Sequence, residues 1–198
     1  MQTRVLVPVA DGTEELEAVA IIDVLRRAGA TVTVASVSGR RQITASRGVV
    51  IVADALIEAC RDDSFDLVVL PGGIPGAEHL RDSEDLTRIL KRQRDNAGMY
   101  GAICASPAVV LAHHGLLAGH RATCHPGFAD RLADPSHTDE RVVMDGNCFT
   151  SRGAGTAVDF ALALVERLYG RAKRDEVAAS MAIKRPTNHK DSTVGGIP

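Results

Sequence analysis

Aromatic side chains are scarce in this 198-residue sequence, which has no Trp, two Tyr and four Phe, or 3% of its residues. A chain so poor in aromatics has little from which to build a base-stacking platform for nucleic acids. An excess of one charge is also missing, because 23 basic residues face 25 acidic ones and the formal net charge is −2. We therefore expect no binding of nucleic acid through a basic face.

Cysteine is scarce as well, with four residues at positions 60, 104, 124 and 148. No two of them form a Cys-x-x-Cys pair, which disfavours a zinc ribbon, and four cysteines in so long a chain do not make a disulfide scaffold. Long apolar runs are absent near the N-terminus, where Asp11 ends a run too short for a signal-peptide core or a membrane span. We therefore expect a cytoplasmic protein with free thiols, no bound metal and no membrane contact.

Short aliphatic segments alternate with helical patterns along the chain, and 45% of the residues are apolar. This alternation predicts a mostly parallel sheet between two layers of helices, a three-layer α/β fold. Strands are expected at 4–9, 31–37, 66–70, 99–103 and 121–124, with hairpins within 42–52 and 142–151. Helices are expected at 14–28, 55–60, 83–95, 105–113, 157–169 and 174–183, the first capped by Thr13 and the third by Ser83. Residues 1–183 are predicted to form one domain and the polar residues 184–198 a C-terminal tail.

Ligands of such a sheet bind beyond the carboxyl ends of its strands. The loop after the first strand has no Gly-x-Gly-x-x-Gly pattern, and Asp11, Glu14 and Glu15 put negative charge where a pyrophosphate needs positive potential. A dinucleotide or flavin is therefore disfavoured, and no cofactor is predicted. The carboxyl ends of the predicted strands instead place the candidate ligand-binding and catalytic residues in four loop segments, residues 10–17, 71–76, 104–107 and 124–127.

Cys104 lies between a predicted apolar strand and a predicted helix that begins at Ala105. A nucleophile on such a tight turn projects above the sheet edge, where the helix dipole favours the thiolate. The alternative is an ordinary buried core cysteine. Cys60 and Cys148 are expected to be packing residues, whereas Cys124 is ambiguous because it adjoins His125.

Glu17 falls on the apolar face of the first predicted helix, whereas Glu14 and Glu15 can face solvent at its start. A carboxyl in a poor dielectric tends to stay protonated and can donate a hydrogen bond to a thiolate or sulfinate. The alternatives are a partly exposed glutamate or a pair with Arg27. His125 follows the predicted strand at 121–124 and could act as base or acid beside Cys104.

The sequence resembles the ThiJ/PfpI superfamily, and within it the branch of the parkinsonism-associated deglycase, over about residues 3–183. Six motifs that follow one another along the chain carry this resemblance. They are Asp-Gly-Thr-Glu-Glu-Leu-Glu at 11–17, Asp-Val-Leu-Arg-Arg-Ala-Gly at 23–29, Leu-Pro-Gly-Gly at 70–73, Ala-Ile-Cys-Ala-Ser-Pro at 102–107, Thr-Cys-His-Pro at 123–126 and Thr-Ser-Arg-Gly-Ala-Gly-Thr at 150–156.

The resemblance implies a flavodoxin-like, glutamine-amidotransferase-like domain that forms a homodimer. It also implies a nucleophile at Cys104, a carboxyl in contact with it at Glu17 and a histidine at His125. The amides that hold an anion would be those of Gly72, Gly73 and Ala105. Ser106 replaces a glycine common in the family, which would slightly narrow the pocket. Three further residues would lie at the dimer interface or in the pocket: Arg47, Arg27 and Glu14.

The leading functional hypothesis is a cofactor-independent glyoxalase or deglycase with a role in oxidative stress. Its substrates would be methylglyoxal, glyoxal or their early adducts on protein side chains and nucleotides. The alternative is a redox-sensing chaperone or binding protein in which Cys104 oxidises to a sulfinate without turnover. The resemblance also carries a thiazole-biosynthesis label for some relatives, and a protease is disfavoured because no extended peptide groove is evident.

Overall fold

A seven-stranded sheet organises the computed structural model, which describes residues 2–183. The strand order is β5–β2–β1–β6–β7–β9–β8, and only β8, at one edge, runs antiparallel to its neighbour. The sheet strands are β1 (Arg4–Val9), β2 (Thr31–Ser36), β5 (Ala55–Leu56), β6 (Leu67–Leu70), β7 (Met99–Ile103), β8 (Val142–Asp145) and β9 (Cys148–Ser151). A separate antiparallel hairpin joins β3 (Gln42–Thr44) to β4 (Val50–Val52).

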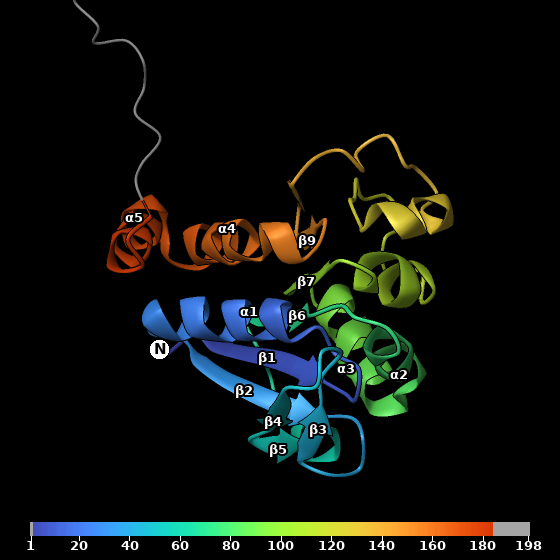
Figure 1. Ribbon diagram of the computed structural model, residues 1–198. Helices are drawn as coiled ribbons and strands as arrows, with labels where there is room; N and C mark the ends of the chain where they lie inside the picture. The colour runs from blue at the N-terminus through green and yellow to red at the C-terminus, as the bar shows by residue number, and fades with distance from the viewer. Residues whose placement is uncertain (1, 184–198) are drawn as a thin grey trace, which may run out of the picture.

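Helices cover both faces of this sheet (Figure 1). The α-helices are α1 (Glu15–Arg27), α2 (Gly76–Asp82), α3 (Glu84–Asp95), α4 (Ala157–Tyr169) and α5 (Arg171–Ser180). Shorter helical turns cover Ile57–Cys60, Pro107–Ala112, Pro126–Arg131 and Ala154–Thr156, of which Pro107–Ala112 is a π-helix. The five long parallel strands follow the order 2-1-3-4-5 of the flavodoxin-like fold, which confirms the predicted fold class.

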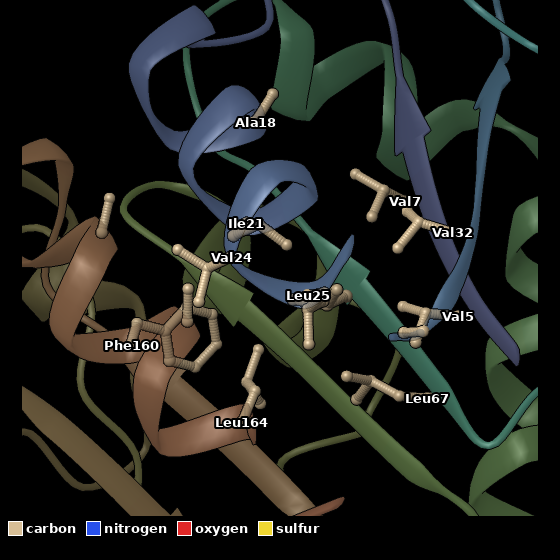
Figure 2. Close-up of a cluster of buried hydrophobic side chains, with 14 of the residues drawn as sticks. Val5, Val7, Ala18, Ile21, Val24, Leu25, Val32, Leu67, Phe160 and Leu164 are labelled. Atoms are coloured by element: carbon tan, nitrogen blue, oxygen red, sulfur yellow. The ribbon is translucent and has the colours of Figure 1, made fainter. Parts of the chain in front are cut away.

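The core is two aliphatic clusters, one on each face of the sheet. Alternate side chains of β1 supply both, because Val5 and Val7 face one layer and Leu6 faces the other. Figure 2 shows the first cluster, where side chains of α1 and α4 meet those of the sheet: Ile21, Val24, Leu25, Phe160, Leu164, Val5, Val7 and Leu67. The second lies beneath α2, α3 and the π-helix. With both faces covered, the carboxyl edge of the strands is left for ligands.

Several predicted elements are confirmed where local signals agree with packing. β1 and α4 have the predicted bounds, and Gly170 ends α4. Ser83 caps α3, since its Oγ accepts a hydrogen bond from the Leu86 amide at 3.3 Å. Thr13, however, is not the cap of α1, because its Oγ1 accepts instead from the Ala10 amide at 2.9 Å.

Other predicted elements are wrong. Residues 121–124 form no strand, because the amides of Arg121 and Thr123 donate to the side chains of Asp145 and Thr150 rather than to a neighbouring backbone. The predicted helix at 55–60 is the two-residue strand β5 followed by a short 3₁₀ turn. The helix predicted at 105–113 begins at Pro107, α5 begins and ends three residues early, and α2 was not predicted at all.

The predicted tail at 184–198 lies outside the described residues. Within residues 2–183, no helix is both long and apolar enough to cross a bilayer.

Candidate active site around Cys104

Cys104 forms a sharp elbow directly after β7. Its φ of +65° lies in the left-handed region, which a residue with a Cβ rarely adopts. The turn is fixed on both sides, because the Cys104 amide donates to the Ser151 carbonyl at 2.9 Å and its carbonyl accepts from the His125 amide at 2.8 Å. Backbone held in such a conformation is a feature of functional sites. Of the four thiols, only Cys104 is partly exposed.

Glu17 reaches the elbow from the first turns of α1. Its side chain is fully buried, and its Oε2 accepts a hydrogen bond from the Gly72 amide at 2.8 Å. Burial raises the pKa of this carboxyl to about 7, which the Gly72 amide and the Cys104 side chain only partly oppose. A proton on the carboxyl therefore resides on Oε1, the oxygen that Gly72 leaves free.

The Cys104 thiol and the Glu17 carboxyl titrate as a pair. Burial, together with the negative charge of Glu17, raises the pKa of Cys104 to about 12, while the amides of Gly73 and Ala105 lower it. The amides at the start of the helix favour the thiolate in direction, as predicted, but burial and the charge of Glu17 outweigh them. Because Glu17 has the lower pKa of the two, the pair carries at most one negative charge at neutral pH, and that charge lies on the Glu17 carboxyl.

The three predicted anion-holding amides have different roles. The amides of Gly73 and Ala105 face the Cys104 sulfur. The Gly72 amide does not, because it donates to Glu17 and fixes the carboxyl instead. The anion site at the sulfur is therefore made by two amides.

Gly72 leaves no room for a side chain between the two reacting groups. A Cβ on Gly72 would lie 2.6 Å from the Cys104 Cβ, 2.9 Å from Glu17 Oε2 and 2.9 Å from the Ile103 carbonyl oxygen. Gly72→Ala is expected to force the thiol and the carboxyl apart and to reduce iodoacetamide alkylation of Cys104, and any turnover, by about tenfold or more. Gly155→Ala is the matched control, because its Cβ meets no atom within 4 Å. Equal alkylation rates in the two variants would contradict this role of Gly72.

His125 lies at the mouth of the site with an exposed ring. Its Nδ1 accepts a hydrogen bond from the Gly127 amide at 3.1 Å, so the neutral ring carries its proton on Nε2. Within residues 2–183, the imidazole makes no hydrogen bond to the Cys104 thiol, and the two residues are joined through backbone atoms. His125 is thus placed to donate from Nε2 to a ligand rather than to accept the thiol proton.

A cavity of about 520 Å³ opens above the sulfur. It brings together five predicted site residues, Cys104, Glu17, His125, Glu14 and Arg47. It also includes Arg141, Arg152 and Thr156, to which no role was assigned from the sequence, although the motif at 150–156 contains two of them. Arg27 is not among the lining residues, because its Nε pairs with Asp23 at 2.6 Å on the exposed side of α1.

The acidic residues at the start of α1 fix the neighbouring hairpin. Glu15 does not face solvent as predicted, because it is buried and accepts hydrogen bonds from the Arg47 amide at 2.9 Å and the Ser46 hydroxyl at 2.8 Å. Burial raises the pKa of Glu15, but its hydrogen bonds lower the pKa by more than burial raises it. The pKa of Glu15 therefore lies below its usual value. Glu14 also accepts from the Ser46 hydroxyl, at 2.6 Å.

Ser106 does not narrow the pocket. Its side chain is fully buried and its Oγ donates to the Pro71 carbonyl at 2.6 Å. The hydroxyl thus ties the elbow to the loop that carries Gly72 and Gly73.

The model of the DJ-1/PfpI family matches residues 3–167. The chain belongs to this family. DJ-1 homolog B of Arabidopsis thaliana is 54% identical over 170 residues, which are 86% of this chain but only 39% of that protein. The Caenorhabditis elegans protein named glutathione-independent glyoxalase DJR-1.2 is 35% identical, over 91% of this chain and 96% of its own length. Oxidized DJ-1 of Toxoplasma gondii has a similar structure, with a TM-score of 0.90 and 45% identity over 92% of this chain and 100% of that one.

Proposed function

We propose that the protein is a cysteine-dependent glyoxalase that needs no cofactor and converts methylglyoxal to lactate. The observation that carries the proposal is the contact of Cys104 with a buried carboxyl and two backbone amides beneath an open cavity. The likeness to a relative named as a glutathione-independent glyoxalase supports it. Lactate formation from methylglyoxal, and its loss in Cys104→Ala, test this function.

The first step forms a hemithioacetal. The Glu17 carboxylate takes the thiol proton onto Oε1 as the sulfur attacks the aldehyde carbon, so that a C–S bond forms and the carbonyl electron pair moves to oxygen. That oxygen takes the proton from Glu17 Oε1, which leaves Glu17 as a carboxylate. The buried site favours this transfer, because the carboxyl with a pKa of about 7 is poised between its two states near neutral pH.

The next steps move a proton between neighbouring carbons. The Glu17 carboxylate removes the proton from the sulfur-bearing carbon, while the ketone oxygen accepts one from His125 Nε2, which gives an enediol. Glu17 then returns its proton to the second carbon, and the hydroxyl on the sulfur-bearing carbon returns a proton to His125 Nε2, which gives a lactoyl thioester. Water then adds to the thioester carbonyl and the C–S bond breaks, which returns the Cys104 thiol and releases lactate and one proton.

The same chemistry extends to early adducts of methylglyoxal on side chains or nucleotides. The Cys104 sulfur forms a bond to the carbinol carbon of such an adduct while the bond from that carbon to the adduct's nitrogen or sulfur breaks, and the departing amine or thiol takes the proton from Glu17 Oε1. The open cavity above Cys104 leaves room for the group that carries the adduct. We include this deglycase activity, with a role in oxidative stress, in the proposed function. Release of lactate from methylglyoxal-treated N-acetylcysteine tests it.

Oxidation of Cys104 is a second candidate function, favoured by the same surroundings. A sulfinate at Cys104 would be held by the Gly73 and Ala105 amides and by a proton on Glu17. We expect mild peroxide to add two oxygens to Cys104 before any other thiol, because Cys60, Cys124 and Cys148 are buried. Peptide mass spectrometry measures this selectivity. Even oxidation of all four cysteines would contradict a sensing role.

The proposal includes a homodimer in the cytoplasm. Large apolar side chains are exposed on α1 and on the adjoining β3–β4 hairpin, where Leu16, Val19, Val50 and Val52 are 56%, 51%, 55% and 62% accessible. A face of this kind is typical of a surface that another protein covers. Sedimentation equilibrium of the purified chain tests the dimer, and a monomer at micromolar concentration would contradict it.

A further inference from the structure

Arg152 is held against the Cys104 elbow by its two chain neighbours. Ser151, which ends β9, accepts the Cys104 amide through its carbonyl. Gly153 packs on the sulfur side, because a Cβ built on it would lie 3.8 Å from Cys104 Sγ. Arg152 itself lines the cavity above the sulfur. Its position relative to the nucleophile is therefore fixed by the backbone on both sides.

The guanidinium of Arg152 has no firm partner. Its Nε is buried and makes no hydrogen bond within residues 2–183. The carboxylate in reach, Asp139, lies 3.8 Å from an Nη atom and is fully exposed. A single long, solvent-exposed ion pair contributes little within the fold, so the Nη groups of Arg152, which lines the cavity, can bind an anion instead.

Two further arginines line the cavity, and they differ from Arg152 in their hydrogen bonds and exposure. Arg141 donates to the Asp159 carboxylate and to the Gly155 carbonyl, so its charge is used within the fold. On the β3–β4 hairpin, the exposed Arg47 guanidinium has no hydrogen bond or ion pair to the described residues. The opposing charges in the cavity are Glu14, which accepts the Ser46 hydroxyl, and the Cys104–Glu17 pair.

We propose that Arg152 binds a carboxylate at the far end of the substrate, so that the preferred substrates are α-oxoaldehydes that carry a carboxylate. The two Nη groups of a guanidinium form a planar fork that matches the two oxygens of a carboxylate. The aldehyde carbon of the same molecule then lies at Cys104. The reaction takes one water and converts R–CO–CHO to R–CHOH–COO⁻ with release of one proton. This inference rests on the proposed glyoxalase function.

Steady-state kinetics with 4,5-dioxopentanoate and methylglyoxal test the inference. We expect wild type to show a kcat/KM at least about tenfold higher for 4,5-dioxopentanoate, as a charge-assisted bidentate contact provides. Arg152→Gln should abolish this preference and Arg152→Lys should restore part of it. Arg94→Gln is the matched control, because Arg94 is an exposed arginine with one ion pair, to Asp95, away from the cavity. A substrate preference that is the same in wild type and Arg152→Gln would overturn the inference.

Protection of Cys104 from iodoacetamide tests the carboxylate site without turnover. Glutarate is expected to slow alkylation in wild type but not in Arg152→Gln, and neutral glutaramide should protect neither. If wild type makes no lactate but glutarate protects it through Arg152, the glyoxalase function fails and the carboxylate site stands. If lactate is made but neither preference nor protection depends on Arg152, the carboxylate site fails and the function stands.

Discussion

Cys104→Ser is expected to lower kcat/KM for methylglyoxal by about 10³ or more, because it removes the nucleophile that forms the hemithioacetal. A serine hydroxyl has nearly the same shape, so the elbow with its φ of +65° is retained. It ionises far less readily than a thiol at neutral pH, and the same burial that raises the pKa of Cys104 opposes the alkoxide further.

The measurement is enzymatic detection of lactate with the buffer-catalysed reaction subtracted. Cys60→Ser serves as the control, because Cys60 is buried in the cluster beneath α2 and α3, with the Leu56 carbonyl in reach for the new hydroxyl. Cys60→Ser should keep its turnover. Lactate production at the wild-type rate by Cys104→Ser would show that the sulfur has no part in the reaction.

Glu17→Gln is expected to reduce kcat/KM for methylglyoxal by about 10² to 10⁴, the usual contribution of a general acid–base group. The amide oxygen of Gln can still accept the Gly72 hydrogen bond that Oε2 accepts now, so the variant should fold. What it lacks is a proton that can leave and return. A pH profile separates this role from a structural one, because wild-type turnover should change as Glu17 titrates near pH 7 and the variant should show no such step.

The same substitution should change how stability depends on pH. The pKa of Glu17 rises from its usual 4.5 to about 7 on folding, so the folded state binds the proton more tightly. The associated stability is complete below pH 4.5 and is lost as the pH rises to 7, by about 3 kcal/mol in total. Urea unfolding of both proteins at pH 4.5 and pH 8 measures the difference. Glu17→Gln should gain stability relative to wild type by that amount at pH 8, and an unchanged difference would contradict a buried carboxyl that ionises in place.

Much of the fold follows from local signals. The β-branched run of β1 is buried on both faces, and Ser83 and Gly170 mark the ends of α3 and α4. The position of Cys104 between a strand and a helix, and of Glu17 on an apolar helix face, could likewise be predicted, because periodicity and the carboxyl-edge rule apply to them directly.

The remainder depends on partners that are distant in the sequence. Residues 121–124 have a strand-like composition, but Asp145 and Thr150 capture their amides through side chains. Gly72 was assigned to the oxyanion, whereas its amide donates to Glu17, 55 residues away in the chain. Arg152 keeps a long ion pair to Asp139 whereas Arg141 pairs closely with Asp159, and no local pattern indicates this difference.

The most direct test of the Cys104–Glu17 mechanism is a single turnover of methylglyoxal with the protein in excess, quenched at intervals and examined by peptide mass spectrometry together with lactate detection. The mechanism predicts an adduct on Cys104, heavier by one methylglyoxal, that appears before lactate and decays as lactate forms. In Glu17→Gln the adduct should form and persist. Lactate that appears while the Cys104 peptide stays unmodified, in wild type and variant alike, would contradict the central role of this pair.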